Sequence, residues 1–276
     1  MPELPEVETV RRSLAPALEG AVVVGVRADH PRMTRRQPRP RDFRDRLLGR
    51  RVDSVGRHGK FMLIEVEGDL TWVIHLGMSG RIRLEAAGSD RIPHTHVVVE
   101  TDRNQELHFV DPRTFGFTAV LTPDEFDAQP FALLGPDALD DLPRYPQLIA
   151  RLADRTVAIK SLLLDQRFVA GLGNIYADEV LHRARIRPGR AAGTLTKEEV
   201  RLLRGSIGPV LRAGLRFGGT SLNDLAYLLP DGRAGEYLAR LKVYGRAGEH
   251  CGRDGTAIER TVIGGRSSFW CPTCQI

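Results

Sequence analysis

The stretch MPELPEVE, residues 1–8, opens the chain and contains the start of its first predicted helix. Apolar residues recur at helical spacing through this region, at Val7, Val10, Leu14 and Leu18. Gly20 follows the last of them as a stop signal. The pattern predicts a helix over residues 3–18. Glu3 and Glu6 lie in its first turn, where carboxylates suit the positive end of the helix dipole.

Pro2 gives this opening a second interpretation. If Met1 is removed, Pro2 presents a secondary amine that can attack a carbonyl-like carbon to form an iminium, with Glu3 beside it as a proton carrier. If Met1 is retained, the nitrogen of Pro2 is an amide and not a nucleophile. Proline followed by glutamate is also an ordinary helix start, so the stretch alone leaves both interpretations open.

Short β-rich runs separated by turn residues follow the helix. They cover residues 22–26, 51–55, 61–66, 71–76, 81–84, 95–100, 105–110 and 115–121. Strands of this length at such regular spacing predict an antiparallel β-sandwich. We therefore expect a domain over residues 1–134 that combines the helix with the sandwich.

The second half of the chain changes character. Residues 135–146 contain three prolines and several acidic residues, and we interpret them as a linker. Helical patterns then occupy residues 147–155, 159–164, 174–183 and 196–217. A capping-box pattern, TKEE, opens the last of these helices, and a glycine-rich stretch follows it. The fold class is α+β with two domains, the helical one spanning 147–242 and ending in a small ribbon at 243–276.

The charge composition favours an anionic partner, but a mild excess of surface charge that serves only solubility is an equally open interpretation. The 276-residue chain has a net charge of +5 and a pI near 9.4, carried mostly by arginine, which binds phosphate in a bidentate manner. Three cysteines lie in the last 26 residues, a pattern typical of a metal site in a reducing compartment rather than of a disulfide scaffold. The chain lacks a signal-peptide pattern and a long apolar run, so we expect a cytoplasmic protein.

The cysteines form a near-complete zinc ribbon. Cys251 and Asp254 make one knuckle, and Cys271 and Cys274 make the other. Because a carboxylate is a harder zinc ligand than a thiolate, three interpretations stay open. Asp254 is the fourth ligand, His250 or water takes its place, or the ribbon holds without metal.

Several other segments carry candidate binding residues. In residues 169–179, VAGLGNIYADE, the glycines lead into a helix whose N-terminus, near Asn174, can bind phosphate or simply form a turn. Lys60 and Lys160 lie at the starts of a predicted strand and helix.

Two loops carry side chains that are costly to expose. Met78 and Phe115 either pack in a core or insert between bases. His94 and His96 alternate on one strand face, where we favour a structural or phosphate-binding role over a metal pair.

Together, the PELPE opening, the GLGNIY motif at 171–176 and the terminal ribbon resemble the formamidopyrimidine-DNA glycosylase family, shared with endonuclease VIII, over essentially the whole chain. The resemblance implies a helix and β-sandwich domain, then a helix–two-turn–helix domain that ends in a zinc finger with one structural Zn²⁺. It also implies damaged double-stranded DNA as the partner, a monomer, and a bacterial, nucleoid-associated location.

The resemblance assigns roles to residues. Pro2 is implied as the nucleophile and Glu3 as its acid–base partner, with Glu6 as a supporting carboxylate. Lys60 is implied with the catalytic pair and, like Asn174 and Arg266, at a phosphate-binding position. The remaining implied DNA contacts are Met78, His94, Arg113, Phe115 and Lys160. Residues 218–237 resemble a mobile loop that closes over an extruded base.

The implied activity is excision of oxidised purines, 8-oxoguanine and formamidopyrimidines, with AP-lyase cleavage by β,δ-elimination. The chain departs from the family pattern at Asp254, where cysteine is usual, and at Thr114, where arginine is common. An endonuclease VIII-type enzyme for oxidised pyrimidines, a non-catalytic lesion-binding protein and a zinc-ribbon protein that contacts other proteins are the alternatives.

Overall fold

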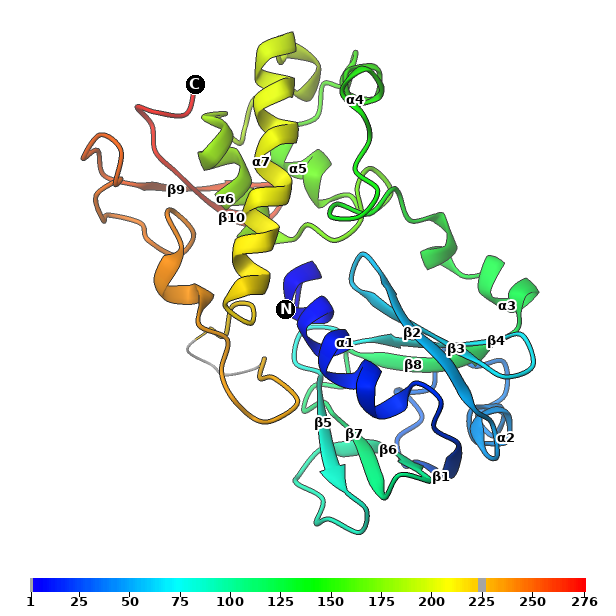
Figure 1. Ribbon diagram of the computed structural model, residues 1–276. Helices are drawn as coiled ribbons and strands as arrows, with labels where there is room; N and C mark the ends of the chain where they lie inside the picture. The colour runs from blue at the N-terminus through cyan, green and yellow to red at the C-terminus, as the bar shows by residue number, and fades with distance from the viewer. Residues whose placement is uncertain (1, 223–226) are drawn as a thin grey trace. The chain divides into compact units, whose positions relative to one another are not determined.

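A computed structural model describes residues 2–222 and 227–276, which form two compact units (Figure 1). The first unit comprises Met1–Leu133 and Leu215–Leu238, and the second comprises Leu134–Gly214 and Ala239–Ile276. Met1, whose removal the sequence left open, lies outside the described residues. So do residues 223–226 of the expected mobile loop.

The first unit begins with α1 (Leu4–Leu18), followed by two antiparallel sheets of four strands each. The strands are β1 (Val23–Ala28), β2 (Val52–His58), β3 (Phe61–Val66), β4 (Leu70–His75), β5 (Arg81–Ala86), β6 (Thr95–Thr101), β7 (Gln105–Val110) and β8 (Phe117–Leu121). Their order is β1-β6-β7-β5 in one sheet and β2-β3-β4-β8 in the other. This confirms the expected helix and sandwich.

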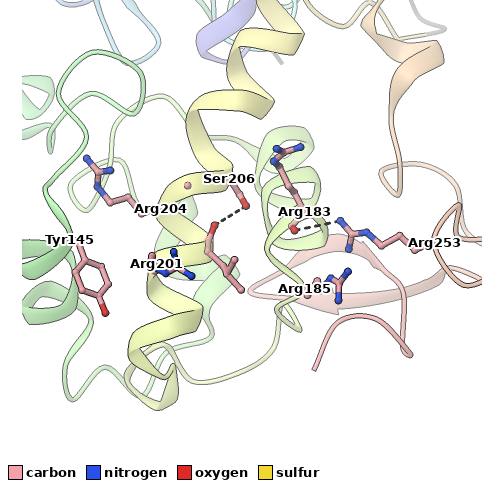
Figure 2. Close-up of a pocket in the computed structure, with 9 residues that line it drawn as sticks. Tyr145, Arg183, Arg185, Arg201, Arg204, Ser206 and Arg253 are labelled. Carbon is pink, nitrogen blue, oxygen red and sulfur yellow. Dashed lines mark hydrogen bonds between the residues drawn. The ribbon is translucent and has the colours of Figure 1, made fainter.

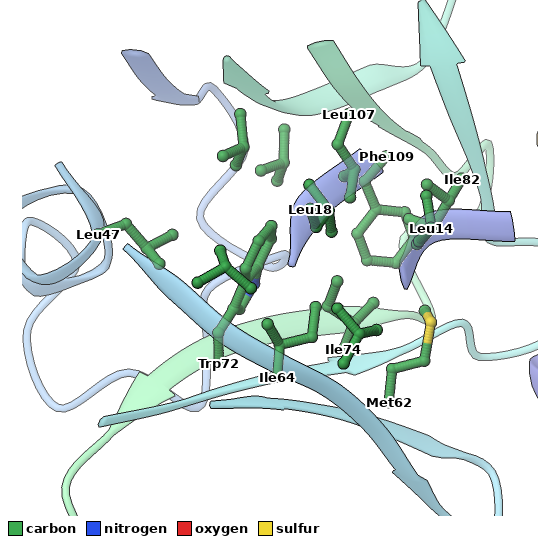
Figure 3. Packing of buried hydrophobic residues seen from close by; sticks show 14 of the residues in the cluster. Leu14, Leu18, Leu47, Met62, Ile64, Trp72, Ile74, Ile82, Leu107 and Phe109 are labelled. Atoms are coloured by element: carbon green, nitrogen blue, oxygen red, sulfur yellow. The ribbon is translucent and has the colours of Figure 1, made fainter. Parts of the chain in front are cut away.

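Residues from α1 and from both sheets form a single core in the first unit. Figure 3 shows Leu14 and Leu18 of α1 among side chains from the sheets, including Trp72 and Phe109. All four side chains are at most 1% exposed. The helical spacing of the apolar residues in α1 therefore gives the face that the sandwich buries.

Three short helical segments in this unit were not expected: α2 (Asp42–Leu47), α3 (Pro123–Asp127) and the 3₁₀ turn η1 (Pro130–Leu133). In α2, only Phe43 and Leu47 are buried apolar residues. One i, i+4 pair is too short a repeat to show a helical period in the sequence.

The second unit is mostly helical. It contains α4 (Tyr145–Leu152), α5 (Ile159–Leu164), α6 (Asn174–Ala184), the 3₁₀ turn η2 (Ala192–Thr194) and α7 (Lys197–Arg216). The expected capping box is present, because Thr196 Oγ1 accepts from the N–H of Glu199 at 3.2 Å and the Glu199 carboxylate accepts from the N–H of Thr196 at 2.8 Å. None of the described helices is long and apolar enough to span a bilayer.

The ribbon closes the second unit as a hairpin of β9 (Glu259–Ile263) and β10 (Arg266–Trp270). Its tight turn pairs Ile263 with Arg266 across Gly264 and Gly265, whose φ values are 55° and 76°. Two consecutive positive φ angles match a type I′ hairpin turn, which glycine adopts without strain.

The segment Leu215–Leu238 belongs to the first unit, although the sequence suggested that residues 218–237 are part of the helical domain. Tyr227 lies in the core of the first unit at 4% exposure, and Leu229 packs against that core. The segment includes the end of α7 and the start of the 3₁₀ turn η3 (Tyr237–Arg240). The segment follows α7 directly in the sequence, which suggested that it belongs to the helical domain. The burial of Tyr227 and the packing of Leu229 place it with the first unit.

His75, at the end of β4, predicts a pH dependence of stability. Its ring lies 4.5 Å from that of Phe61 and 5.6 Å from that of Phe117, and burial, with help from the Lys60 charge, lowers its pKa to about 4. Since the unfolded chain takes up the proton first, stability should fall as pH drops from about 6.5 towards 4, by up to about 3 kcal/mol from this group.

Urea unfolding at several pH values should show that the slope in this window is smaller in His75→Phe than in wild type. Equal slopes in the two proteins would assign the acid sensitivity to other groups.

Candidate nucleic-acid interface and metal centre

The first turn of α1 is held by the buried carboxylate of Glu6. One of its oxygens accepts from the backbone N–H of Glu3 at 2.8 Å, and the other accepts from the N–H of Thr220 at 2.7 Å. Pro2 is buried, and Glu3 and Glu6 are 2% and 1% exposed. The N-terminal turn is therefore ordered and largely shielded from water, with a carboxylate adjacent to Pro2.

The segment that contacts Glu6 approaches it with its backbone. Gly219 has φ 82°, and a Cβ there would lie 2.7 Å from Glu6 Oε1. The Tyr227 hydroxyl lies 3.1 Å from the Gly218 carbonyl, to which it donates, and burial followed by the Glu6 charge raises its pKa well above the usual value. Only glycine fits at position 219, because any Cβ there would collide with the Glu6 carboxylate. The hydrogen bond from the next residue, Thr220, to Glu6 anchors the base of the expected loop to the N-terminal turn.

Lys60 lies in the turn between β2 and β3 and is only 6% exposed. The next residue, Phe61, pairs with His75 of β4 in the sheet, and the Lys60 charge contributes to the lowered pKa of His75. Gly59, before Lys60, has φ 56°, a left-handed conformation that lets the hairpin turn tightly.

Asp111 joins the two loops that carry Met78, Arg113 and Phe115, here called the wedge residues. Its carboxylate accepts from Ser79 Oγ at 2.5 Å and from the N–H of Gly116 at 2.7 Å, and the residue is fully buried. A Cβ on Gly77 would lie 2.4 Å from Gly116 N, so the loops touch backbone to backbone. Residues 76–80 and 111–116 are thus joined into one assembly of two loops.

That assembly exposes the three side chains that the sequence singled out. Met78 is 38% exposed and Phe115 is 40% exposed, and the Arg113 guanidinium lies 5.5 Å from the centre of the Phe115 ring. Thr114 between them is nearly buried and has φ 51°, an unusual conformation for a β-branched residue. The Met78 and Phe115 side chains are exposed on loops that the buried Asp111 carboxylate joins. Exposure of this kind fits insertion into another molecule better than packing in the core.

In the structure, a third histidine, His30, lies near His94 and His96. The His96 ring lies 6.2 Å from that of His94 and 5.0 Å from that of His30. His94 is exposed and its φ is 68°. Within the described ranges, these rings do not form a group of potential metal ligands, so the metal pair is not supported.

In the second unit, the carbonyl of Ser267 joins the ribbon to the GLGNIY motif. It accepts from Asn174 Nδ2 at 3.0 Å and from Lys160 Nζ at 2.9 Å. Asn174 is the first residue of α6, so its contact with the Ser267 carbonyl places the start of that helix beside β10. Arg266, one residue before Ser267, is exposed. The structure therefore places Asn174 and Arg266 in one neighbourhood.

Lys160 differs from the expected DNA contact. It is fully buried and its ammonium lies 2.7 Å from the Asp178 carboxylate, which also accepts from the N–H of Phe269 at 2.9 Å. Burial raises the pKa of Asp178 to about 7, against the opposing effect of Lys160. In this geometry Lys160 orients the ribbon and does not present its charge to a phosphate.

The four predicted metal ligands converge at the end of the ribbon. One ligand atom from each of Cys251, Asp254, Cys271 and Cys274 lies within 4.8 Å of all the others. The Sγ atoms of Cys251 and Cys274 are 3.9 Å apart, close to the separation of about 3.8 Å that tetrahedral Zn–S bonds of about 2.3 Å give. The donor set thus fits one zinc ion.

Asp254 occupies the fourth position better than His250 does. Its oxygens lie 3.3 and 3.5 Å from Cys271 Sγ, whereas His250 Nδ1 is engaged with the Gly255 carbonyl at 2.8 Å. His182, which the sequence did not single out, places Nε2 3.5 Å from Cys251 Sγ. A group that contacts a metal-binding thiolate, as His182 contacts Cys251, orients that ligand and tunes its charge.

Sequence motifs did not predict several residues whose hydrogen bonds hold segments of the chain together. Asp111, Ser79, Asp178 and His182 act through contacts between different segments of the chain, and even for Asp178, which lies within the motif at residues 169–179, the motif does not reveal this role. Glu179 belongs to this set as well, because its carboxylate accepts from the N–H groups of Lys242, Val243 and Tyr244.

Comparison with known proteins places this arrangement in a family. Residues 1–118 match the formamidopyrimidine-DNA glycosylase N-terminal domain, residues 134–225 match the H2TH domain of the same glycosylases, and residues 248–276 match the zinc finger found in FPG and IleRS.

Relatives match over the full length. A formamidopyrimidine-DNA glycosylase of Rhizorhabdus wittichii is 44% identical over 276 residues, covering 100% of both chains. The MutM (Fpg) crystal structure from Thermus thermophilus is 40% identical with a TM-score of 0.88, over 99% of this chain and 98% of that one. A Lactococcus lactis FPG mutant in complex with Fapy-dG containing DNA is 33% identical with a TM-score of 0.90, over 99% of both.

Removing the Asp111 carboxylate should loosen the wedge assembly. Asp111→Ala leaves the buried Ser79 hydroxyl and Gly116 N–H without their acceptor, which should cost about 1–3 kcal/mol in the free energy of unfolding. Hydrogen exchange at the Gly116 amide should become much faster.

Asp137→Ala is the matched control, because Asp137 is also buried and accepts from two backbone N–H groups, in the second unit. It should lose similar stability while Gly116 stays protected. Unchanged Gly116 exchange in Asp111→Ala would contradict the role given to Asp111.

Zinc affinity should follow the chemistry of residue 254. Asp254→Ala should weaken zinc binding roughly tenfold or more, and Asp254→Cys should strengthen it, because thiolate is the softer ligand. Competition with a chromophoric chelator and elemental analysis measure both. Asp127→Ala, an exposed carboxylate of the first unit, should match wild type. Equal zinc content in Asp254→Ala and wild type would exclude Asp254 as a ligand.

Proposed function

The chain belongs to the formamidopyrimidine-DNA glycosylase family, and from that premise we propose that it is a bifunctional DNA glycosylase and AP lyase of base excision repair. Its proposed substrates are oxidised purines, 8-oxoguanine and formamidopyrimidines, in duplex DNA. The relatives' names and the Fapy-dG complex of the Lactococcus lactis protein support this substrate class.

The observation that carries the proposal is the N-terminal turn anchored by Glu6. It holds Pro2 next to the buried Glu3 and ties both to the segment that contains Tyr227. A nucleophile of this kind needs a fixed position, because correct orientation alone can contribute about 7–11 kcal/mol to lowering a barrier. With Met1 removed, the Pro2 nitrogen becomes a secondary amine in that fixed turn.

In the proposed reaction, the Pro2 amine attacks C1′ of the damaged nucleoside. The C1′–N bond breaks, the base leaves with its electron pair and takes up a proton, and the sugar opens to an iminium on Pro2. The iminium acidifies the neighbouring C–H bonds, so loss of the 3′ phosphate and then the 5′ phosphate follows by β- and δ-elimination. Glu3 is the proposed proton carrier and could contribute about 10²–10⁴-fold.

The enzyme must also extrude the nucleotide, since C1′ of a stacked nucleotide is inaccessible. We propose that Met78, Arg113 and Phe115 fill the gap in the duplex, which would offset part of an unstacking cost of a few kcal/mol. Their exposure on loops fixed by Asp111 supports this role. Arg113 would then face the orphaned cytosine.

Phosphate contacts are proposed for Lys60, Asn174 and Arg266, with His94 as a further DNA contact. The exposed Arg266 supports the assignment, and so does its neighbourhood, because the carbonyl of the next residue, Ser267, accepts from Asn174. Zinc, when bound, would hold the ribbon that carries Arg266. We further propose that the protein acts as a monomer in the bacterial cytoplasm, associated with the nucleoid.

Borohydride trapping tests the mechanism. With a duplex containing 8-oxoguanine opposite cytosine, wild type should form a stable covalent adduct, because borohydride reduces the iminium. Pro2→Gly should form much less or none. Intact-mass measurement of both proteins establishes whether Met1 is removed.

A second duplex containing thymine glycol separates the neighbouring substrate class. Preferential trapping on thymine glycol would favour an endonuclease VIII-type enzyme. A wild-type protein that lacks Met1 and binds both duplexes without forming an adduct would instead indicate a non-catalytic lesion-binding protein.

A further inference from the structure

A basic pocket in the second unit lies apart from the proposed phosphate contacts. It has a volume of about 560 Å³ and opens between the end of α6, the first half of α7 and the start of α4 (Figure 2). The side chains that line it include five arginines: Arg183, Arg185, Arg201, Arg204 and Arg253. No acidic residue lines it within the described part of the chain.

Backbone carbonyls hold two of these arginines in place. Arg204 Nε donates to the Pro143 carbonyl at 2.7 Å, and Arg253 Nη1 donates to the His182 carbonyl at 2.6 Å. The Arg253 contact also caps the negative end of α6, which would otherwise repel an anion. A guanidinium has five N–H donors, so each of these arginines keeps donors for a ligand.

The charges in the pocket are poorly neutralised. Arg201 forms an ion pair with Glu198 at 2.5 Å, and both side chains are mostly exposed. Among the residues that the structure describes, none of the other four arginines has a carboxylate within ion-pair distance. Elsewhere, many arginines of this chain are paired, as Arg190 is with Glu199. Arg183, Arg185 and Arg204 thus lack an anionic partner among the described residues, while Arg253 Nη1 also donates to Cys274 Sγ at 3.7 Å. Arginines that line one concavity in this way favour an anion of high charge.

Gly205 gives the pocket its depth. It lies in the middle of α7, and a Cβ built on it meets no atom within 4 Å. Glycine in a helix interior costs about 0.5–1 kcal/mol relative to alanine, and its φ is not in the left-handed region. Tyr145 and Leu202 add an aromatic ring and an apolar side chain to the lining.

The pocket is distinct from the Asn174 neighbourhood. Asn174 begins α6, and the pocket lies at the other end of that helix, ten residues and about 15 Å away along the helix axis. The proposed DNA contacts therefore do not account for it.

We propose that this pocket binds a small anion with two or more phosphate groups, of the nucleoside diphosphate or triphosphate class. The guanidiniums bind the phosphates through bidentate hydrogen bonds, and Tyr145 and Leu202 contact the less polar part of the ligand. A volume of about 560 Å³ suits a ligand of that size, whereas a regular duplex backbone does not need a concave site.

Titration calorimetry at constant ionic strength, with inorganic tripolyphosphate and with ADP as probes, tests the proposal. Wild type should bind one equivalent of each. Gly205→Leu fills the pocket without changing any charge and keeps a good helix former, so it should abolish binding while thermal stability is retained or increased. Arg183→Gln combined with Arg185→Gln should weaken binding at least tenfold.

Two controls keep the test specific. Arg155→Gln removes one exposed arginine of the same unit outside the pocket, and Arg266→Ala removes the proposed phosphate contact of the ribbon. Both should bind the probes as wild type does. Binding that survives in Gly205→Leu, binding lost in Arg266→Ala, or no binding to wild type would each overturn the proposal.

The salt dependence of duplex binding distinguishes DNA as the source of the phosphates. If the pocket binds a small anion, the slope of log K against log salt should be the same in the Arg183→Gln, Arg185→Gln double variant and in wild type. A slope lower by about two units would identify the duplex backbone as the occupant and overturn the proposal. Neither result depends on whether the protein excises a base.

Discussion

The carboxylate of Glu6 is the constraint on which the first unit depends. A buried carboxylate is costly unless its oxygens accept hydrogen bonds, and here each oxygen accepts from a backbone N–H. One donor is Glu3, the N-cap residue of α1, and the other is more than two hundred residues later, at Thr220. The same group therefore orders the N-terminal turn and draws residues 215–238 into the first unit.

The second unit uses the same principle with different partners. Asp178 binds the ribbon backbone at Phe269 and pairs with Lys160, and Glu179 beside it accepts from three successive N–H groups. Breaking a buried pair of this kind is strongly destabilising because it leaves an uncompensated charge. Consecutive carboxylates on α6 thus hold the ribbon and the chain that leads into it. The exposed Arg266 depends on that support.

Positive charge is distributed over several sites in this protein rather than concentrated in one. The exposed Arg113 and Arg266 belong to the proposed DNA contacts, Lys160 is neutralised inside the second unit, and the arginine pocket has no carboxylate lining among the described residues. Net charge alone could not separate these roles, since buried, paired and unpaired cations count equally in it. Burial and ion pairing distinguish them.

By itself, the sequence predicted the antiparallel strands, a helix over residues 3–18, the capping box at Thr196 and the two metal-binding knuckles, with the role of Asp254 left open. These follow from local periodicity, turn residues and short spacings, which report the physics of neighbouring residues. Only the tertiary structure decided that Lys160 is buried, that Asp111 unites two loops and that Tyr227 belongs to the first core. Each of these depends on contacts between residues far apart in the chain, where side-chain burial and the need to satisfy buried polar groups act and no local pattern records the outcome.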